Sequence, residues 1–427
     1  MDASDRSGVS GDPSVPGPST PGPGMPVPGT PAGSDSVPQA TGGTQAKRRL
    51  VGLDAARGIA LIGMMAIHVL PAWTEDFEPT LSWSLFAGKS AALFAVLAGV
   101  TLAFTSGGRK PVRGRALTAA RASLAVRGLL ILGLGLTIAY FDMPAYIILA
   151  YYGVMFLLAI PLLGLSFRPA AAAALAFALA GPVIMQALRD GLPLPGYDPT
   201  FSTAIADPAV FFSQMLITGV YPALPWMAYI CAGLGVGRLN LTEARIQIRL
   251  LTGGAALALG AWLVSVLALG PLGGLKAIKA ATPASAEAIN DILIWGPDPS
   301  LPTTSWWWLT IVAPHSSTPL DILLTIGTSL AILGAVLLAA PAISGVLTPL
   351  AAAGTMTLTL YTTHLLVLAT GFLADLPYLS WGIQVAAALV FAVLWQKSRG
   401  RGPLERLIGA ASGRTRNRVL ASGLPPK

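Results

Sequence analysis

Cysteine, histidine and charged side chains are all scarce in this chain of 427 residues. The one cysteine, Cys231, excludes a disulfide within the chain and a cysteine-based metal site, so we expect no metal. Charged residues make up 11% of the chain, hydrophobic residues make up 54%, and the mean hydropathy is +0.67. These values lie outside the range of soluble domains, and they predict an all-α polytopic membrane protein.

The basic residues are distributed unevenly along the chain. The net charge is +8, and most of the 27 lysines and arginines lie in segments that we expect on the cytosolic side. Arg189, Lys276 and Lys279 fall in the expected outer loops. This is the positive-inside bias of membrane proteins. No basic cluster lies on a soluble domain, so we expect membrane lipid, and no nucleic acid, as a partner.

Composition divides the chain into a membrane domain and two tails. Residues 1–46 are rich in proline, glycine and serine, which predicts a disordered cytosolic tail. Residues 47–409 are expected to form the membrane domain, and residues 410–427 a basic cytosolic tail. Apolar segments of the domain predict about ten spans, with both termini cytosolic. The expected spans are 53–73, 83–104, 122–141, 145–165, 170–188, 220–238, 251–270, 318–340, 350–372 and 381–396.

The first expected span carries ionisable residues along one face. Asp54, Arg57, Leu61, Met64 and His68 recur at helical spacing, so they form one stripe. An ionised group at hydrocarbon depth is costly unless it faces protein or water, so we expect the other spans to pack around this stripe. Asp54 and Arg57 lie one turn apart, and they form either a structural ion pair or part of a ligand site.

All three histidines are expected at a similar depth, in the outer half of the membrane. His68 lies near the end of the first span, His315 just before the eighth, and His364 within the ninth. Histidine takes and releases a proton near neutral pH, as the activation of a hydroxyl or amine requires. A lone buried histidine is more often a hydrogen-bonded core residue, but three at one level favour a function. Tyr361 shares a face of the ninth span with His364.

Lys89, Arg127 and Asp321 are the other ionisable residues that we single out in expected spans. Arg127 lies near a basic loop, where snorkelling to the surface explains a cation. Lys89 lies level with His68, where an ammonium group can hold an anionic acceptor or stabilise an oxyanion. Asp321 is in the first turn of its helix, where it either caps exposed amides or orients the imidazole of His315.

Six segments, in order, resemble a known group of membrane enzymes. LDAARGIALIGMMAIH at 53–68 is similar to the first span of the transmembrane acyltransferase group that includes heparan-α-glucosaminide N-acetyltransferase. The other five segments are GKSAALFAVLAG at 88–99, ILAYYGVMFLLAIPLL at 148–163, YPALPWMAYICAGLGVGRL at 221–239, APHSSTPLDILLTIGTSLAILG at 313–334 and GTMTLTLYTTHLLVLA at 354–369. Together they extend over most of residues 48–409.

The resemblance implies an acyl-CoA co-substrate, usually acetyl-CoA, that is loaded from the cytosol, and a sugar or glycan acceptor outside. It also implies a multi-pass protein of the bacterial plasma membrane. On this basis we expect His68, or His315 with Asp321, to deprotonate the acceptor or carry the acetyl group. Lys89 and His364 are then expected to stabilise the oxyanion of acyl transfer.

The same resemblance suggests a cofactor site at the cytosolic end of the first span. Arg57 and the basic loop after the second span are expected to bind the phosphates of CoA. Asp54, Arg127 and Tyr361 complete the expected cofactor-binding residues. One feature departs from the group: in the lysosomal relative the essential histidine follows the first span, whereas residues 69–82 contain no histidine here.

A secondary transporter of a small metabolite or lipid precursor is the alternative from another class, with the buried charges as its path. Against it, we see neither inverted repeats nor paired broken helices in the sequence. A structural or sensory membrane protein is a third alternative. The sequence leaves open the acceptor, transfer to oxygen or nitrogen, the catalytic histidine, and the role of the outer loop 271–315. The oligomeric state is also open, with a homodimer as one alternative.

Overall fold

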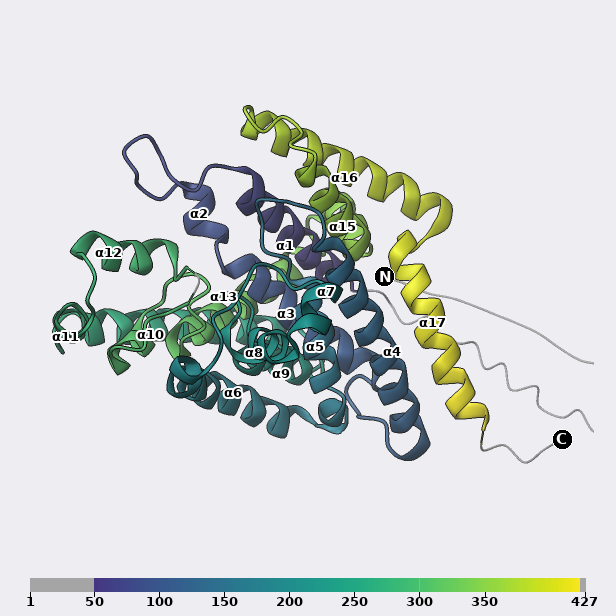
Figure 1. Ribbon diagram of the computed structural model, residues 1–427. Coiled ribbons are helices and arrows are strands. Elements are labelled where there is room, and N and C mark those ends of the chain that lie inside the picture. The colour runs from purple at the N-terminus through teal and green to yellow at the C-terminus, as the bar shows by residue number, and fades with distance from the viewer. Residues whose placement is uncertain (1–49, 299, 423–427) are drawn as a thin grey trace, which may run out of the picture. The chain divides into compact units, whose positions relative to one another are not determined.

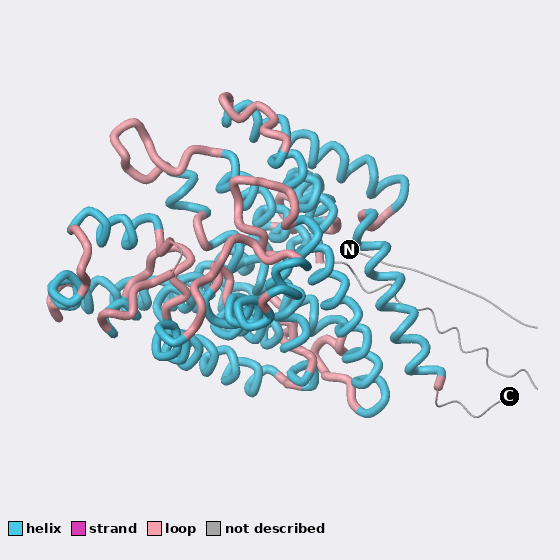
Figure 2. Tube along the Cα trace, in the orientation of Figure 1, coloured by secondary structure: helices cyan, strands magenta, loops and turns pink. Residues whose placement is uncertain are grey.

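The computed structural model describes residues 50–298 and 300–422, which are helical and contain no β-strand (Figure 1). Figure 2 shows the same arrangement as helices joined by loops. Extended backbone pairs in one isolated bridge, between Trp73 and Pro79. The expected all-α fold is therefore confirmed for this part of the chain. The expected tail, 1–46, lies outside the described residues.

Seven helical segments of the described chain are long and apolar enough to cross a membrane, and two bent helix pairs raise this number to nine. The protein is therefore a multi-pass membrane protein. The seven are α1 (Val51–Val69), α2 with α3 (Leu81–Phe86 and Lys89–Thr105), α4 (Gly114–Ile138), α6 (Phe167–Leu188), α10 (Ala244–Leu269), α13 (Pro319–Ala339) and α16 (Pro377–Arg399). The pairs are Pro208–Thr218 with α9 (Ala223–Val236), and α14 (Ser344–Gly354) with α15 (Thr357–Ala369).

The fourth expected span, 145–165, is shorter than the sequence predicts. It holds α5 (Leu149–Leu158) and a 3₁₀ turn, η1 (Pro161–Gly164). The 10 residues of α5 rise about 15 Å, which is about half the hydrocarbon thickness. The α5 helix is therefore too short to cross the membrane by itself, and Pro161 prevents its continuation.

The ninth expected span, 350–372, is not one continuous helix, because α14 and α15 meet at 72°. At the break, a carboxylate from α17 (Pro403–Ala421) reaches the first turn of α15. This carboxylate, Glu405, accepts hydrogen bonds from the backbone N–H groups of Leu358 and Thr359 at 2.7 and 3.2 Å. These amides have no partner within α15 at its start, so Glu405 acts as the cap of the new helix.

The α1 helix contacts α3, α13, α14, α15 and α16. Its approach to α14 depends on two glycines, since a Cβ at Gly354 would collide with the carbonyl oxygen of Asp54, and a Cβ at Gly58 with the backbone of α14. Asp54, Leu61 and Met64 are buried. The expected packing of other helices around the α1 stripe is therefore confirmed at these three positions.

The expected outer loop, 271–315, has a folded structure rather than an irregular one. A small apolar cluster of its own includes Ile278, Ile289 and Trp308, and the indole of Trp308 is fully buried. This cluster holds the loop's short helices together. They are α11 (Gly274–Ala281), α12 (Ala286–Trp295) and the 3₁₀ helix η4 (Trp306–Thr310).

The expected basic C-terminal tail, 410–427, forms much of α17 where the structure describes it. This helix packs against α4. The Arg115 guanidinium of α4 donates from Nε to the carbonyl oxygen of Val419 at 3.0 Å. The remaining short elements are η2 (Arg189–Gly191), α7 (Phe201–Ala206), α8 (Pro208–Ser213) and the π-helical turn η3 (Gln214–Thr218).

Candidate active site

His68 and His364 are 296 positions apart in the sequence and contact each other directly in the structure. His68 Nδ1 lies 3.1 Å from His364 Nε2. The rings are nearly parallel, with an interplanar angle of 7° and centroids 5.3 Å apart. The last turn of α1 supplies one ring and the middle of α15 supplies the other. Two of the three histidines therefore form one hydrogen-bonded pair.

The pair continues into α16 through two residues that the sequence analysis did not single out. His364 Nδ1 lies 2.8 Å from Gln384 Oε1. Gln384 Nε2 donates to Ser380 Oγ at 3.1 Å, and Ser380 Oγ donates to the carbonyl oxygen of Phe372 at 2.9 Å. Gln384 and Ser380 are four residues apart in an apolar helix, so they share one face. A polar pair of this kind within an apolar span is a signal from which a buried polar contact could have been predicted from the sequence.

A cavity of about 450 Å³ opens beside this network. His68, Asp142 and Ser380 are its main polar lining residues, and most of the remaining lining is apolar, including Met143 and Phe372. The Asp142 carboxyl is exposed. The cavity therefore gives a small polar molecule access to the His68 imidazole, and the Asp142 carboxylate is part of the same lining.

His315 lies in the loop before α13, in a left-handed backbone conformation with φ of 56°. Its ring packs edge-on against Tyr221, with centroids 5.4 Å apart. Its Nδ1 is buried and has no hydrogen-bond partner among residues 50–298 and 300–422. Burial lowers the pKa of His315 to about 4, so the imidazole is neutral at physiological pH. It is close enough to interact electrostatically with His68.

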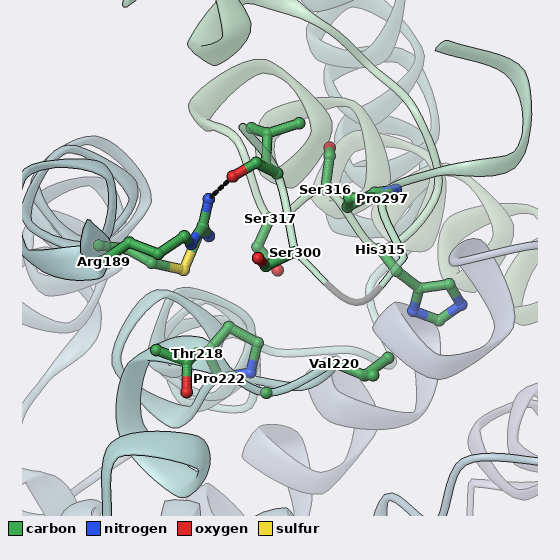
Figure 3. A pocket seen from close by; sticks show the side chains of 12 residues that line it. Arg189, Thr218, Val220, Pro222, Pro297, Ser300, His315, Ser316 and Ser317 are labelled. Atoms are coloured by element: carbon green, nitrogen blue, oxygen red, sulfur yellow. Dashed lines mark hydrogen bonds between the residues drawn. The ribbon is translucent and has the colours of Figure 1, made fainter. Parts of the chain in front are cut away.

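A second, much smaller cavity of about 20 Å³ is lined in part by the His315 loop. Its lining includes Arg189, Thr218, Ser300 and Ser317. Figure 3 shows the imidazole of His315 directed away from Arg189 and Ser300. This cavity has room for about one water molecule, so it is too small for a substrate.

Lys89 and Asp321 are near enough to attract each other electrostatically. Lys89 Nζ also donates to the carbonyl oxygen of Ser84 at 2.7 Å. The Asp321 backbone N–H donates to Thr318 Oγ1 at 3.1 Å, so the Thr318 side chain caps the start of α13. The structure thus places Asp321 with Lys89, and within the described chain it gives His315 Nδ1 no bond to Asp321.

Arginine side chains gather at the other end of the α1 stripe. Arg57 Nη1 donates to Asp54 Oδ1 at 2.6 Å, and Arg57 Nη2 donates to Thr101 Oγ1 at 2.7 Å. Arg127 of α4 lies within electrostatic range of Arg57 and of Arg401. Arg127 Nε is buried without a hydrogen-bond partner in the described chain. Arg401, which the sequence analysis did not single out, therefore adds a third cation to this end.

Tyr361 lies at the histidine end rather than with the arginines. Its ring centroid is 6.2 Å from that of His68. Its hydroxyl is buried and forms no hydrogen bond of normal geometry with the described residues. The structure thus groups Tyr361 with His68 and His364, and groups Asp54, Arg57 and Arg127 at the other end. The catalytic and cofactor-binding roles of all these residues stay predictions.

One family model matches the sequence, and its description is heparan-alpha-glucosaminide N-acetyltransferase, catalytic. It matches residues 49–266, which is just over half of the chain. The matched region includes Arg57, His68, Lys89 and Arg127, whereas His315 and His364 lie beyond it. A search of curated protein sequences finds no match.

Proposed function

The chain belongs to the heparan-alpha-glucosaminide N-acetyltransferase catalytic family, and we propose that it transfers an acetyl group from cytosolic acetyl-CoA to an extracytoplasmic amino sugar or glycan. The family consists of membrane acetyltransferases, and the chain is a multi-pass membrane protein. One observation supports the proposal most strongly. The His68 imidazole faces a cavity at one end of the α1 stripe that carries Arg57 toward the other end.

At the acceptor end, His68 is the proposed general base. Its partner His364 holds the ring in place, and the cavity of about 450 Å³ admits the acceptor to it. Asp142 in the cavity lining suits the ammonium or hydroxyl groups of an amino sugar. The hydroxyl of Tyr361, whose ring lies beside His68, and the Lys89 ammonium group are proposed to stabilise the oxyanion. A positioned base of this kind contributes roughly 10²–10⁴-fold to the rate.

At the donor end, three guanidinium groups fit the phosphates of CoA. Arg127 lies within electrostatic range of Arg57, of Arg401 and of the Glu405 carboxylate. Arg127 Nε is a buried donor without a partner in the described chain. A phosphate oxygen would satisfy this donor. When bound, acetyl-CoA supplies an activated acetyl thioester. The protein's part at this end is to bind and orient the charged portion of the molecule.

The two ends are separated by roughly 17 Å, the rise of the eleven residues from Arg57 to His68. Leu61 and Met64 lie between them and are buried, at 1% and 7% exposed. The acetylated arm of CoA must displace these side chains to approach His68. Met64 has three rotatable bonds and a soft thioether, so it is the side chain that moves at least cost.

Radiolabelled acetyl-CoA and glucosamine, incubated with the purified protein in detergent, test the proposal. We expect acceptor-dependent release of CoA and labelled N-acetylglucosamine, and loss of both products in His68→Gln. Gln396→Leu is a matched control that should remain active, because Gln396 lies twelve residues from Gln384 on α16 and its amide donates to Thr355 Oγ1 rather than to the histidine network. Equal product formation by His68→Gln and the wild type would contradict the assigned base.

A secondary transporter remains the second candidate, because the structure contains two bent helix pairs, at 48° and 72°. Broken helices are frequent at the substrate sites of transporters. Uptake of labelled glucosamine into proteoliposomes separates the two functions. Uptake of unmodified glucosamine without CoA release would favour the transporter, whereas acetylation without uptake of the free sugar supports the enzyme.

A further inference from the structure

The hydrogen bonds that lead from α16 to His68 have a defined direction, because they end on a backbone carbonyl. The Phe372 carbonyl oxygen can only accept, so Ser380 Oγ is the donor in their 2.9 Å bond. Ser380 Oγ is then the acceptor for the Gln384 amide nitrogen at 3.1 Å. This contact orients the Gln384 amide with its oxygen toward His364 Nδ1, at 2.8 Å.

The orientation of the Gln384 amide decides which nitrogen of each imidazole carries the proton. An amide oxygen accepts, so His364 is protonated on Nδ1. In a neutral imidazole the other nitrogen has the lone pair, so His364 Nε2 accepts from His68 Nδ1 at 3.1 Å. His68 therefore carries its proton on Nδ1. Its Nε2 keeps a lone pair on the ring that lines the larger cavity.

We propose that Gln384 and Ser380 are positioning residues that hold His68 in the Nδ1–H tautomer and so make its Nε2 the basic nitrogen. Neither residue touches a reacting atom in this arrangement. Its consequence for catalysis rests on the proposed function, whereas the tautomer is a property of the resting protein. Gln384 is neutral, so the network orients both rings without adding a negative charge beside them.

The proposed step moves one proton. The N–H or O–H bond of the acceptor breaks as the acceptor nitrogen or oxygen bonds to the acetyl carbon, and the proton forms a new bond to His68 Nε2. His68 is then an imidazolium whose Nδ1–H still donates to His364 Nε2. The electron pair of the broken thioester bond stays on the sulfur of CoA, which takes up the proton when His68 releases it. Atoms and charge balance without an oxidant or a metal.

Nitrogen-15 NMR of histidine-labelled protein in lipid bilayers measures the tautomer directly. The chain has three histidines, so His68→Gln, His315→Gln and His364→Gln assign every ring signal. At about pH 8.5, where ordinary imidazoles are neutral, we expect His68 to be protonated on Nδ1 and unprotonated on Nε2. Protonation of His68 on Nε2 would show that the amide has the opposite orientation and would overturn the inference.

Gln384→Leu removes the oxygen that fixes the direction of the network. We expect a mixture of both tautomers at His68, a fall in kcat of roughly 10-fold, which is part of what a positioned base contributes, and an unchanged KM for acetyl-CoA. Gln396→Leu, the same substitution on the same helix, should leave the His68 signals unchanged. A single Nδ1–H tautomer in folded Gln384→Leu would overturn the positioning role. Should this variant fail to fold, the wild-type spectrum still decides the tautomer.

The NMR spectrum tests the tautomer of His68, and the acetyl-transfer assay tests the proposed function, so either statement can be contradicted without the other. The expected tautomer in a protein that releases no CoA would contradict the proposed function and leave the inference standing. Acceptor-dependent CoA release by a protein with His68 protonated on Nε2 would contradict the inference and leave the proposed function standing. Ser380→Thr keeps the hydroxyl group and is expected to retain the wild-type tautomer of His68. Ser380→Ala is expected to lose part of the preference of His68 for the Nδ1–H tautomer.

Discussion

The two ends of the α1 stripe place ionisable groups in contrasting surroundings. At the histidine end, His68 bonds to His364, which has an uncharged amide as its other partner, and a cavity adjoins the ring. At the arginine end, Arg57 is paired with Asp54, and Arg127 lies within electrostatic range of both Arg57 and Arg401. An accessible imidazole suits proton transfer, whereas an excess of cations suits phosphate binding. Substitutions at the first end should therefore lower kcat, and substitutions at the second should raise KM.

The largest expected effect comes from His68→Gln. Without the base, kcat should fall roughly 10²–10⁴-fold while KM for acetyl-CoA stays near the wild-type value. Steady-state kinetics with acetyl-CoA and glucosamine measure both constants. His315→Gln is the matched comparison, because His315 lies nearby without a bond to either histidine in the described chain. A larger fall in kcat in His315→Gln than in His68→Gln would identify His315, rather than His68, as the base.

The pH dependence of stability tests whether the buried His315 imidazole is neutral in the folded protein. The folded-state pKa of His315 is about 4, below the ordinary value of 6.5, because the ring is buried. Between these values the unfolded chain binds the proton and the folded protein does not, so stability falls as the pH drops from 6.5 to 4. The loss should approach about 3 kcal/mol. Thermal unfolding across this range checks it, and His315→Gln should lose less stability over the same range than the wild type.

At the arginine end, Arg57→Lys keeps the charge opposite Asp54 but removes the planar fork that matches a phosphate. We expect KM for acetyl-CoA to rise roughly 10-fold, as the loss of one charge-assisted hydrogen bond would produce, with little change in kcat. Arg115→Lys, between α4 and α17, is the control and should leave KM unchanged. A fall in kcat at constant KM would contradict the assignment of acetyl-CoA binding to the arginine end and of proton transfer to the histidine end.

The smallest expected effect comes from Glu405→Gln at the break between α14 and α15. The carboxylate caps the amides of Leu358 and Thr359, and a neutral amide accepts these bonds more weakly. The free energy of unfolding should fall by about 1 kcal/mol. Thermal unfolding measures this change. A variant as stable as the wild type would show that the break does not depend on this cap.

Helical periodicity predicts the stripe on α1, its burial and the contact between Asp54 and Arg57, because these features depend on residues within one helix. The family resemblance is confirmed by the match over 49–266, which includes four of the six segments that carry it. The apolar segments predict most of the spans. They overestimate the length of the helix that contains α5, since an apolar segment can be interrupted by a proline turn without a change in hydropathy.

The contacts between helices could not be read from the sequence in the same way. The bond between His68 and His364 depends on how α1 packs against α15, and Gln384 joins it from a third helix. The bend at α15 depends on Glu405, which is 47 positions from the amide of Leu358. Such positions carry no local signal of their partner, although a glutamine and a serine on one face of an apolar helix do indicate that some partner exists.

Transfer of a labelled acetyl group across a membrane tests the central claim most directly. Proteoliposomes with glucosamine inside receive radiolabelled acetyl-CoA outside, and the internal sugar is recovered and separated. The division of α1 into a donor end and an acceptor end predicts labelled N-acetylglucosamine inside the vesicles with wild-type protein and none with His68→Gln. Two results would contradict the division of α1 into a donor end and an acceptor end. One is release of CoA outside while the internal glucosamine stays unlabelled, and the other is transfer of label that persists in His68→Gln.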